Sequence, residues 1–145
     1  MLMGEFNHSI DPKGRVIVPA KLREQLGEEF VITKGLDGCL FGYPMDEWKK
    51  FEEKLQTLPL NTKNARQLAR YFLAGATTAE IDKQGRILIP QVLREFASLD
   101  KDIVLTGAGN RIEIWNKATW TEMISSYDDN MDDVAESMSS LGFMI

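Results

Sequence analysis

One stretch of sequence occurs twice in this chain of 145 residues. Residues 10–24 read IDPKGRVIVPAKLRE, residues 81–95 read IDKQGRILIPQVLRE, and the two align without a gap at eight identical positions. The likeness continues, with a small gap, from residues 30–48 to residues 103–120. A unit of about 45 residues is too short to bury a secure core of its own. The two copies are therefore expected to pair and to share one core.

Each copy carries the same order of local signals. In the first copy a turn containing Asp11 and Gly14 precedes an apolar, β-branched run, and Pro19 opens a short helix that Gly27 ends. The first copy predicts strands over 6–10, 16–18, 30–33 and 39–43 and helices over 20–26 and 46–56. The second copy predicts strands over 86–89, 103–106 and 111–115, a helix within 90–97 and another after Asn116. The fold class is therefore mainly β with short helices.

Residues 61–77, between the copies, have the spacing of a helix. Apolar residues at that spacing predict one packed face, formed by Ala65, Leu68, Ala69 and Phe72. Basic residues fall on the other face, namely Lys63, Arg66 and Arg70. A charged face of this kind favours a solvated surface over a contact with nucleic acid.

The net charge of −5 argues against nucleic acid as a partner until its distribution is considered. Residues 121–145 hold six acidic residues and no lysine or arginine, so the first 120 residues have a net charge of +1. The segment 9–26 carries four basic and two acidic residues. Because local patches decide nucleic-acid binding, the acidic total does not exclude such a partner.

The residue types exclude several other kinds of site. The single cysteine, Cys39, cannot form a disulfide within the chain, and one cysteine with one histidine cannot build a Cys/His metal site. No metal or cofactor is therefore expected. No apolar run is long enough to span a bilayer, and the first residues lack the pattern of a signal peptide. We expect an intracellular protein with no membrane partner.

The repeated Asp-x-x-Gly-Arg turn carries the chemistry that needs explaining. An aspartate at its start can accept hydrogen bonds from turn amides or pair with the arginine four residues on, and the glycine permits a positive φ. This gives candidate turn-stabilising residues Asp11, Gly14, Asp82 and Gly85. Cations at the exposed tips suit phosphate or guanine, which gives candidate DNA-binding residues Lys13, Arg15, Lys83 and Arg86. The residues alone leave open whether the turns bind DNA or only staple the chain.

These motifs resemble the paired motifs of the MraZ family, within the AbrB/SpoVT superfamily of bacterial DNA-binding proteins. The resemblance rests on residues 11–19, DPKGRVIVP, and on their copy at 82–90. It also covers the start MLMGEFNHSID, GLDGCLFGYPMDEW at 35–48 and NRIEIW at 110–115. It extends over residues 1 to about 125, with both copies in order.

The resemblance implies a pseudo-symmetric swapped-hairpin (double-split) β-barrel built by both halves of one chain. The corresponding parts are a first AbrB-like repeat at 1–58, a linker helix at 59–77, a second repeat at 78–125 and an acidic tail at 126–145. It also implies a ring-shaped homo-oligomer, cytoplasmic and nucleoid-associated. Its implied role is control, typically repression, of the division and cell-wall gene cluster that contains its own gene, through repeated promoter sites.

The functional residues that the resemblance carries over lie in the turns: Asp11, Lys13, Arg15, Asp82, Lys83 and Arg86. Arg15 and Arg86 are expected to contact base edges, and the lysines to contact phosphates. Lys21, Arg23 and Arg94 are further phosphate candidates, although Arg23 and Arg94 could instead pair with Glu24 or Glu95. The copies differ at Pro12-Lys13 against Lys83-Gln84, so unequal base contacts are expected.

Two other functions compete with DNA binding. An enzyme could use Asp11 and Asp82 as paired carboxylates, but each is followed by a basic turn, and no phosphate loop, nucleophile elbow or metal triad lies nearby. An antitoxin-like or scaffold protein is the better rival, since superfamily relatives include antitoxins that hold a partner with a C-terminal tail. Here both copies are followed by helices and one tail exists, which favours the regulator.

The acidic tail itself admits two interpretations. Its Asp128-x-Asn130-x-Asp132 pattern resembles the start of a calcium loop, but the sixth position is Asp133 and the twelfth is Ser139, so the pattern fails. Apolar residues instead have helical spacing, at Met131, Val134, Ala135, Met138 and Leu141. The tail therefore predicts a short amphipathic helix that docks on its own ring or on a neighbour, or stays mobile.

Overall fold

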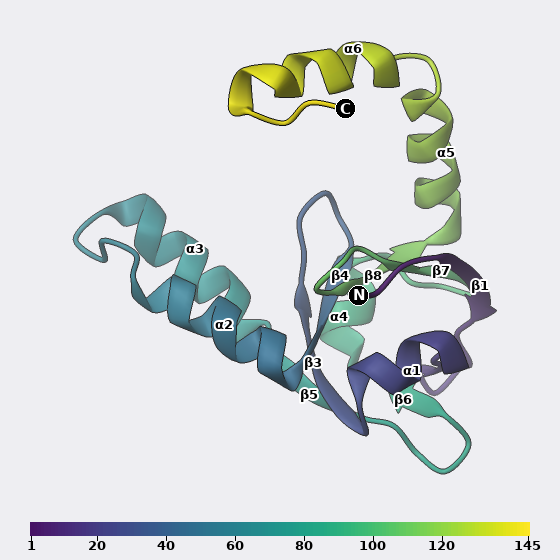
Figure 1. Cartoon of the computed structure of the whole chain (residues 1–145). Coiled ribbons are helices and arrows are strands. Elements are labelled where there is room, and N and C mark those ends of the chain that lie inside the picture. The colour runs from purple at the N-terminus through teal and green to yellow at the C-terminus, as the bar shows by residue number, and fades with distance from the viewer.

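A computed structural model describes all residues, 1–145 (Figure 1). Its centre is a six-stranded antiparallel sheet with the strand order β1-β7-β8-β4-β3-β5. These strands are β1 (Glu5–Ser9), β3 (Glu29–Lys34), β4 (Leu40–Pro44), β5 (Thr77–Glu80), β7 (Asp102–Gly107) and β8 (Ile112–Asn116). A separate two-stranded ribbon pairs β2 (Arg15–Ile17) with β6 (Arg86–Leu88). The predicted fold class, mainly β with short helices, is confirmed.

The two copies exchange strands. β1 of the first copy pairs with β7 of the second, and β5 of the second copy pairs with β3 of the first. β2 and β6 pair with each other, and an isolated bridge from Ile10 to Val16 links the ribbon to the end of β1. The swapped pairing is therefore present in the chain, whereas closure of all strands into a full barrel stays a prediction.

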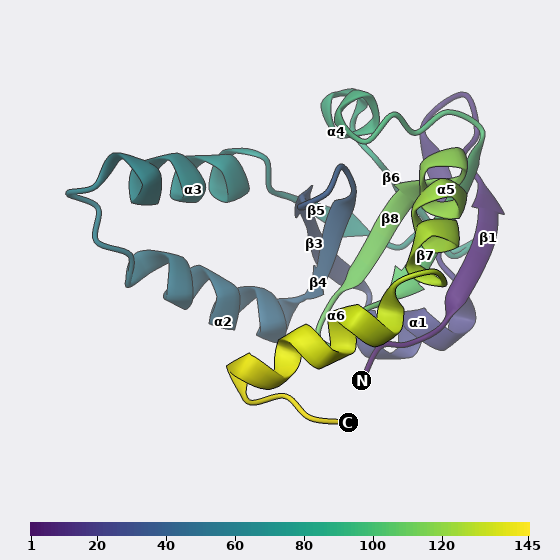
Figure 2. The ribbon, with the colours of Figure 1, turned by 90° about the horizontal axis from the view of Figure 1, so that it is seen from above.

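Six helices accompany the strands, and two of them in each copy occupy equivalent places. They are α1 (Ala20–Leu26), α2 (Met45–Gln56), α3 (Lys63–Ala74), α4 (Gln91–Phe96), α5 (Lys117–Tyr127) and α6 (Met131–Ser137), followed by the short 3-10 helix η1 (Met138–Leu141). Pro19 and Pro90 stand just before α1 and α4, where a missing N–H costs no helical hydrogen bond. α2 and α3 form a helical hairpin that projects to one side of the sheet (Figures 1 and 2). None of the helices is both long and apolar enough to cross a membrane.

One core is shared by both copies, as the short repeat predicts. It contains equivalent residues of the ribbon strands and the helices that follow, such as Val16 with Ile87 and Leu22 with Leu93, all at most 3% exposed. A second cluster lies where the α2–α3 hairpin meets the sheet and includes Trp48, Phe72 and Trp115. Cys39 is fully buried in that cluster, and burial raises the pKa of its thiol to about 12.

The C-terminal segment forms the predicted amphipathic helix but packs against little of the chain. α5 follows β8 and rises away from the sheet, and α6 runs sideways from the upper end of α5 (Figure 1). No residue from 126 to 145 is buried, and the apolar face of α6 stays exposed, with Met131 44% and Val134 41% accessible. This face therefore has no partner within the chain.

Candidate nucleic-acid interface

The first Asp-x-x-Gly-Arg turn is held by the carboxylate of Asp11. Its Oδ1 accepts hydrogen bonds from the backbone N–H of Lys13 at 3.0 Å and of Arg15 at 2.8 Å. Its Oδ2 accepts from Arg15 Nε at 2.7 Å. Two backbone bonds close the same turn, from Asp11 N to Arg15 O and from Gly14 N to Asp11 O. One carboxylate thus fixes both the path of the backbone and the direction of the arginine.

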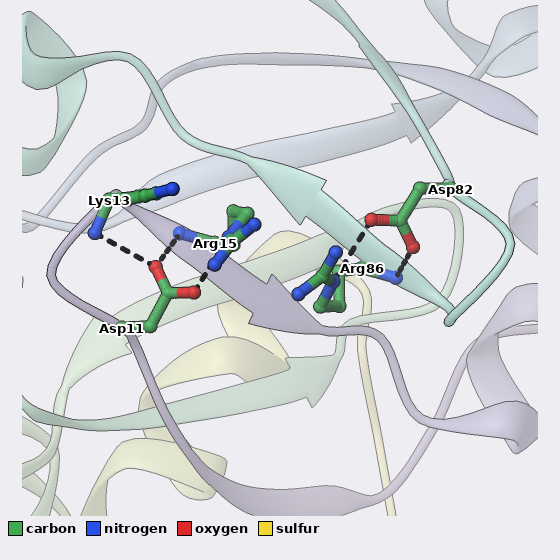
Figure 3. A network of polar contacts seen from close by, with 5 residues as sticks. All are labelled: Asp11, Lys13, Arg15, Asp82 and Arg86. Carbon is green, nitrogen blue, oxygen red and sulfur yellow. Dashed lines mark hydrogen bonds and ion pairs between the residues drawn. The ribbon is translucent and has the colours of Figure 1, made fainter.

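The second turn repeats this geometry almost atom for atom. Asp82 Oδ1 accepts from Gln84 N and Arg86 N at 2.9 Å each, and Oδ2 accepts from Arg86 Nε at 2.9 Å. Figure 3 shows both arrangements, with Arg15 and Arg86 side by side on the ribbon and their aspartates toward its opposite ends. Each aspartate therefore stabilises its turn and orients its arginine at the same time, so these two roles are not alternatives.

Both aspartates have a lower pKa than a free aspartate side chain. The backbone N–H of Arg15, followed by the side-chain bond from the same residue, lowers the pKa of Asp11 despite some desolvation. Arg86 lowers the pKa of Asp82 in the same way. Each carboxylate is thus ionised at neutral pH and committed to its own turn. Such a pair is unsuited to sharing one proton as the two carboxylates of an aspartic protease do.

The turn glycines are favoured by their backbone conformation, and each also leaves room for an arginine of the other copy. Gly14 has φ +90° and Gly85 has φ +80°, in the left-handed region that favours glycine. A Cβ on Gly14 would lie 2.8 Å from the guanidinium of Arg94, and one on Gly85 would lie 2.6 Å from that of Arg23. The packing is exchanged between copies, because the helix of each copy places its arginine on the turn of the other. No local sequence signal could have indicated this contact.

Arg23 and Arg94 form no ion pair with Glu24 or Glu95, so that alternative is wrong. Arg94 instead donates from Nε to Ile89 O at 2.9 Å, whereas Nε of Arg23 is buried without a partner. The backbone is tied across copies as well, from Ile89 N to Gly14 O and from Val18 N to Gly85 O. These contacts hold each turn against the opposite strand.

The ribbon presents four side chains outward, and we call Arg15, Ile17, Arg86 and Leu88 the outer ribbon face. Between them Val16 and Ile87 point inward and are each 1% exposed. The side chains of Arg15 and Arg86 are 34% and 26% exposed. Each uses Nε alone in its bond to aspartate, so both terminal amino groups make no hydrogen bond within the chain.

Cations from both copies lie on this face or at the two turns beside it. They are Lys13, Arg15 and Arg23 of the first copy and Lys83, Arg86 and Arg94 of the second. Lys13 and Lys83 are exposed at the turn tips and form no ion pair. The aspartates of the two turns are already paired, so the site remains rich in cations with free donors. Such an arrangement suits a polyanion that also offers hydrogen-bond acceptors.

Comparison with known proteins identifies relatives along the whole chain. The family model described as "MraZ protein, putative antitoxin-like" matches residues 1–71 and again residues 72–140. The "Transcriptional regulator MraZ" of Lachnoclostridium phytofermentans is 61% identical over 142 residues, with 98% of both chains covered. The protein of that name in Caldanaerobacter subterraneus subsp. tengcongensis is 57% identical over 140 residues, covering 97% of this chain and 98% of its own. A solution structure of PHS018 from Pyrococcus horikoshii aligns with a TM-score of 0.33 at 18% identity, covering 79% of this chain and 88% of its own.

Proposed function

Because this chain belongs to the MraZ family, we propose that it is a transcriptional regulator that binds specific sites in double-stranded DNA. In this proposal it represses the bacterial division and cell-wall gene cluster that includes its own gene. The observation that carries the DNA-binding part is the outer ribbon face. It holds two arginines in matching positions, each oriented by an aspartate and each with free terminal amino groups.

The geometry suits the major groove. That groove admits a two-stranded β-ribbon, and a guanidinium donates two parallel hydrogen bonds to guanine O6 and N7. The bond from Nε to aspartate restricts the arginine before DNA arrives, so less side-chain freedom is lost on binding. We assign base contacts to Arg15 and Arg86. Lys13 and Lys83, at the exposed tips, contact phosphates and position the ribbon without reading sequence.

The proposed DNA sites are repeated, and a homo-oligomer would repeat the outer ribbon face in the same way. One ribbon offers few base contacts and would bind weakly alone. A ring-shaped homo-oligomer in the cytoplasm, associated with the nucleoid, would present many ribbons to repeated promoter sites. Binding by the first ribbon then raises the effective concentration of the next, provided the site spacing fits.

A protein-interaction role is the second candidate, and one observation favours it. The C-terminal tail exposes several large apolar residues without an intramolecular partner, including Leu141, Phe143 and Ile145. An antitoxin-like or scaffold protein would use such a segment to hold another protein. We rank this below DNA binding because the tail occurs once, whereas the paired arginine turns occur in both copies.

The test compares selective DNA binding by matched arginine variants. Fluorescence anisotropy would measure affinity for the duplex upstream of the chain's own gene and for a scrambled duplex, over a salt series. Arg15→Ala and Arg86→Ala should each weaken binding to the upstream duplex by about 1–3 kcal/mol, which is roughly 5- to 150-fold. Affinity should also fall steeply with salt, in proportion to the phosphates neutralised.

The control is Arg70→Ala, which removes the same charge from α3, on the projecting helical hairpin. It should leave selectivity unchanged. Variants at Arg15 and Arg86 that bind like the wild type, or a wild type without preference for the upstream duplex, would contradict the proposal. The turns would then be structural, and the search would move to protein partners of the tail.

A further inference from the structure

Two large aliphatic side chains stand exposed in the middle of the cationic site. Ile17 is 46% and Leu88 57% accessible, while the neighbouring ribbon residues Val16 and Ile87 are fully buried. They occupy equivalent positions in the two copies, each two residues after the arginine of its turn. The solvated face of an antiparallel ribbon ordinarily carries polar residues. The folded chain gives these aliphatic groups no packing role that would explain them.

The strand register places each aliphatic side chain beside an arginine. Arg15 lies opposite Leu88, and Ile17 lies opposite Arg86. Residues opposite each other in such a pair have Cβ atoms about 4.5–5.5 Å apart, and residues two apart in one strand are separated by roughly 7 Å. Two cations and two apolar groups therefore alternate on the outer ribbon face, both along each strand and across the pair. Its spacing corresponds to one or two base steps of about 3.4 Å.

The major groove offers a matching pattern of groups. Guanine presents the acceptors N7 and O6 to an arginine, and the 5-methyl group of thymine is the apolar group available to an aliphatic side chain. On the basis of the proposed function, we infer that Ile17 and Leu88 are specificity-determining residues that contact thymine methyl groups beside guanines contacted by Arg15 and Arg86. The favoured sites then contain thymine within one or two steps of guanine, once for each half of the ribbon.

Charge argues against a second copy of this chain as the occupant of the face. Arg15 and Arg86 lie opposite Leu88 and Ile17, Lys13 and Lys83 are exposed at the two turns, and the aspartates of those turns are already paired. Two such faces brought together would place like charges against each other, which is costly at an interface. DNA instead supplies phosphates for the surrounding cations and methyl groups for the centre.

Deoxyuridine gives a direct test, because it differs from thymidine in the 5-methyl group alone. Each thymine of the upstream duplex would be replaced in turn, and the affinity of the wild-type protein measured by anisotropy. Replacement at the contacted thymines should weaken binding about fourfold per methyl group, as expected for burial of one such group. Replacement at thymines outside the site should change nothing.

Protein variants separate methyl contact from an effect on DNA shape. With Ile17→Ala or Leu88→Ala, the fourfold preference for thymine over uracil should vanish at the position that the altered side chain contacts and persist at the other. Ile17→Val should retain part of it. Leu73→Ala, at an exposed leucine of α3, is the matched control and should retain it fully. A preference that survives in both alanine variants would mean that the methyl group acts through DNA shape, and would overturn the inference.

The outcomes distinguish this inference from the proposed function. If Arg15→Ala abolishes selective binding but neither deoxyuridine nor Ile17→Ala changes affinity, the inference fails and the regulator stands. If the wild type shows no sequence preference, the proposed function fails first. If Ile17→Ala changes the mass in size-exclusion light scattering and leaves methyl discrimination intact, the aliphatic residues contact protein and the inference is wrong.

Discussion

The Asp11 carboxylate has two roles, because it accepts hydrogen bonds from the backbone amides of its turn and also restrains the Arg15 guanidinium. Asp11→Asn keeps the size of the side chain but removes the charge. We expect it to leave Arg15 mobile and to weaken selective DNA binding, although no DNA-contacting residue has been changed. Anisotropy with the upstream duplex measures this. Asp132→Asn, in the exposed helix α6, removes the same charge and should not weaken binding.

The same carboxylate also makes a prediction about pH. The pKa of Asp11 is lower in the folded chain than in the unfolded one, chiefly through the hydrogen bond from Arg15 N. The unfolded state therefore binds protons first as the solution is acidified, and the stabilisation from Asp11 is present at neutral pH. It should be lost as pH falls below about 4 and through the folded pKa. Urea unfolding should show the difference between wild type and Asp11→Asn shrinking over that range; a constant difference would contradict it.

At the scale of the element, the turn and the helix of the opposite copy form one unit. Gly14→Ala forces a left-handed φ on alanine and pushes its Cβ against Arg94 and Ile89 O. We expect a loss of about 1–3 kcal/mol in the free energy of unfolding. Gly109→Ala is the matched control, since Gly109 has φ +88° with open space around it, and should cost less. Equal losses in urea unfolding would mean that Arg94 contributes nothing to the turn.

Most local elements are predicted by the sequence, although β5 (Thr77–Glu80) is not, and neither is the exchange of strands between the copies. Residues 20–26 form a helix as expected, because Pro19 and Gly27 mark its ends and Leu22 and Leu26 face the core. Hydrogen-bonded partners leave no comparable local mark, so the pairing of β1 with β7 follows from the repeat and the family resemblance rather than from periodicity. For the same reason the position of Arg23 over Gly85, about sixty residues away in sequence, was missed.

At the scale of the whole molecule, positive and negative charge are segregated. The ribbon gathers cations, whereas residues 126–145 carry five of the chain's acidic residues, namely Asp128, Asp129, Asp132, Asp133 and Glu136. No residue of this segment is buried, so its removal should leave the core intact. The negative charge of the acidic tail is suited to repelling non-specific DNA, which makes no favourable base contacts that could offset the repulsion.

Deletion of residues 126–145 should therefore strengthen binding to a scrambled duplex and leave binding to the upstream duplex less affected. The increase in affinity for the scrambled duplex should become smaller at high salt, because the Debye length falls from about 10 Å at 0.1 M to about 3 Å at 1 M. A variant that keeps the tail but changes its five acids to Asn or Gln separates charge from the apolar surface of α6. If that variant behaves like the wild type while the deletion does not, the apolar face is responsible. If both variants bind scrambled DNA with the affinity of the wild type, the tail does not weaken non-specific binding and the prediction is wrong.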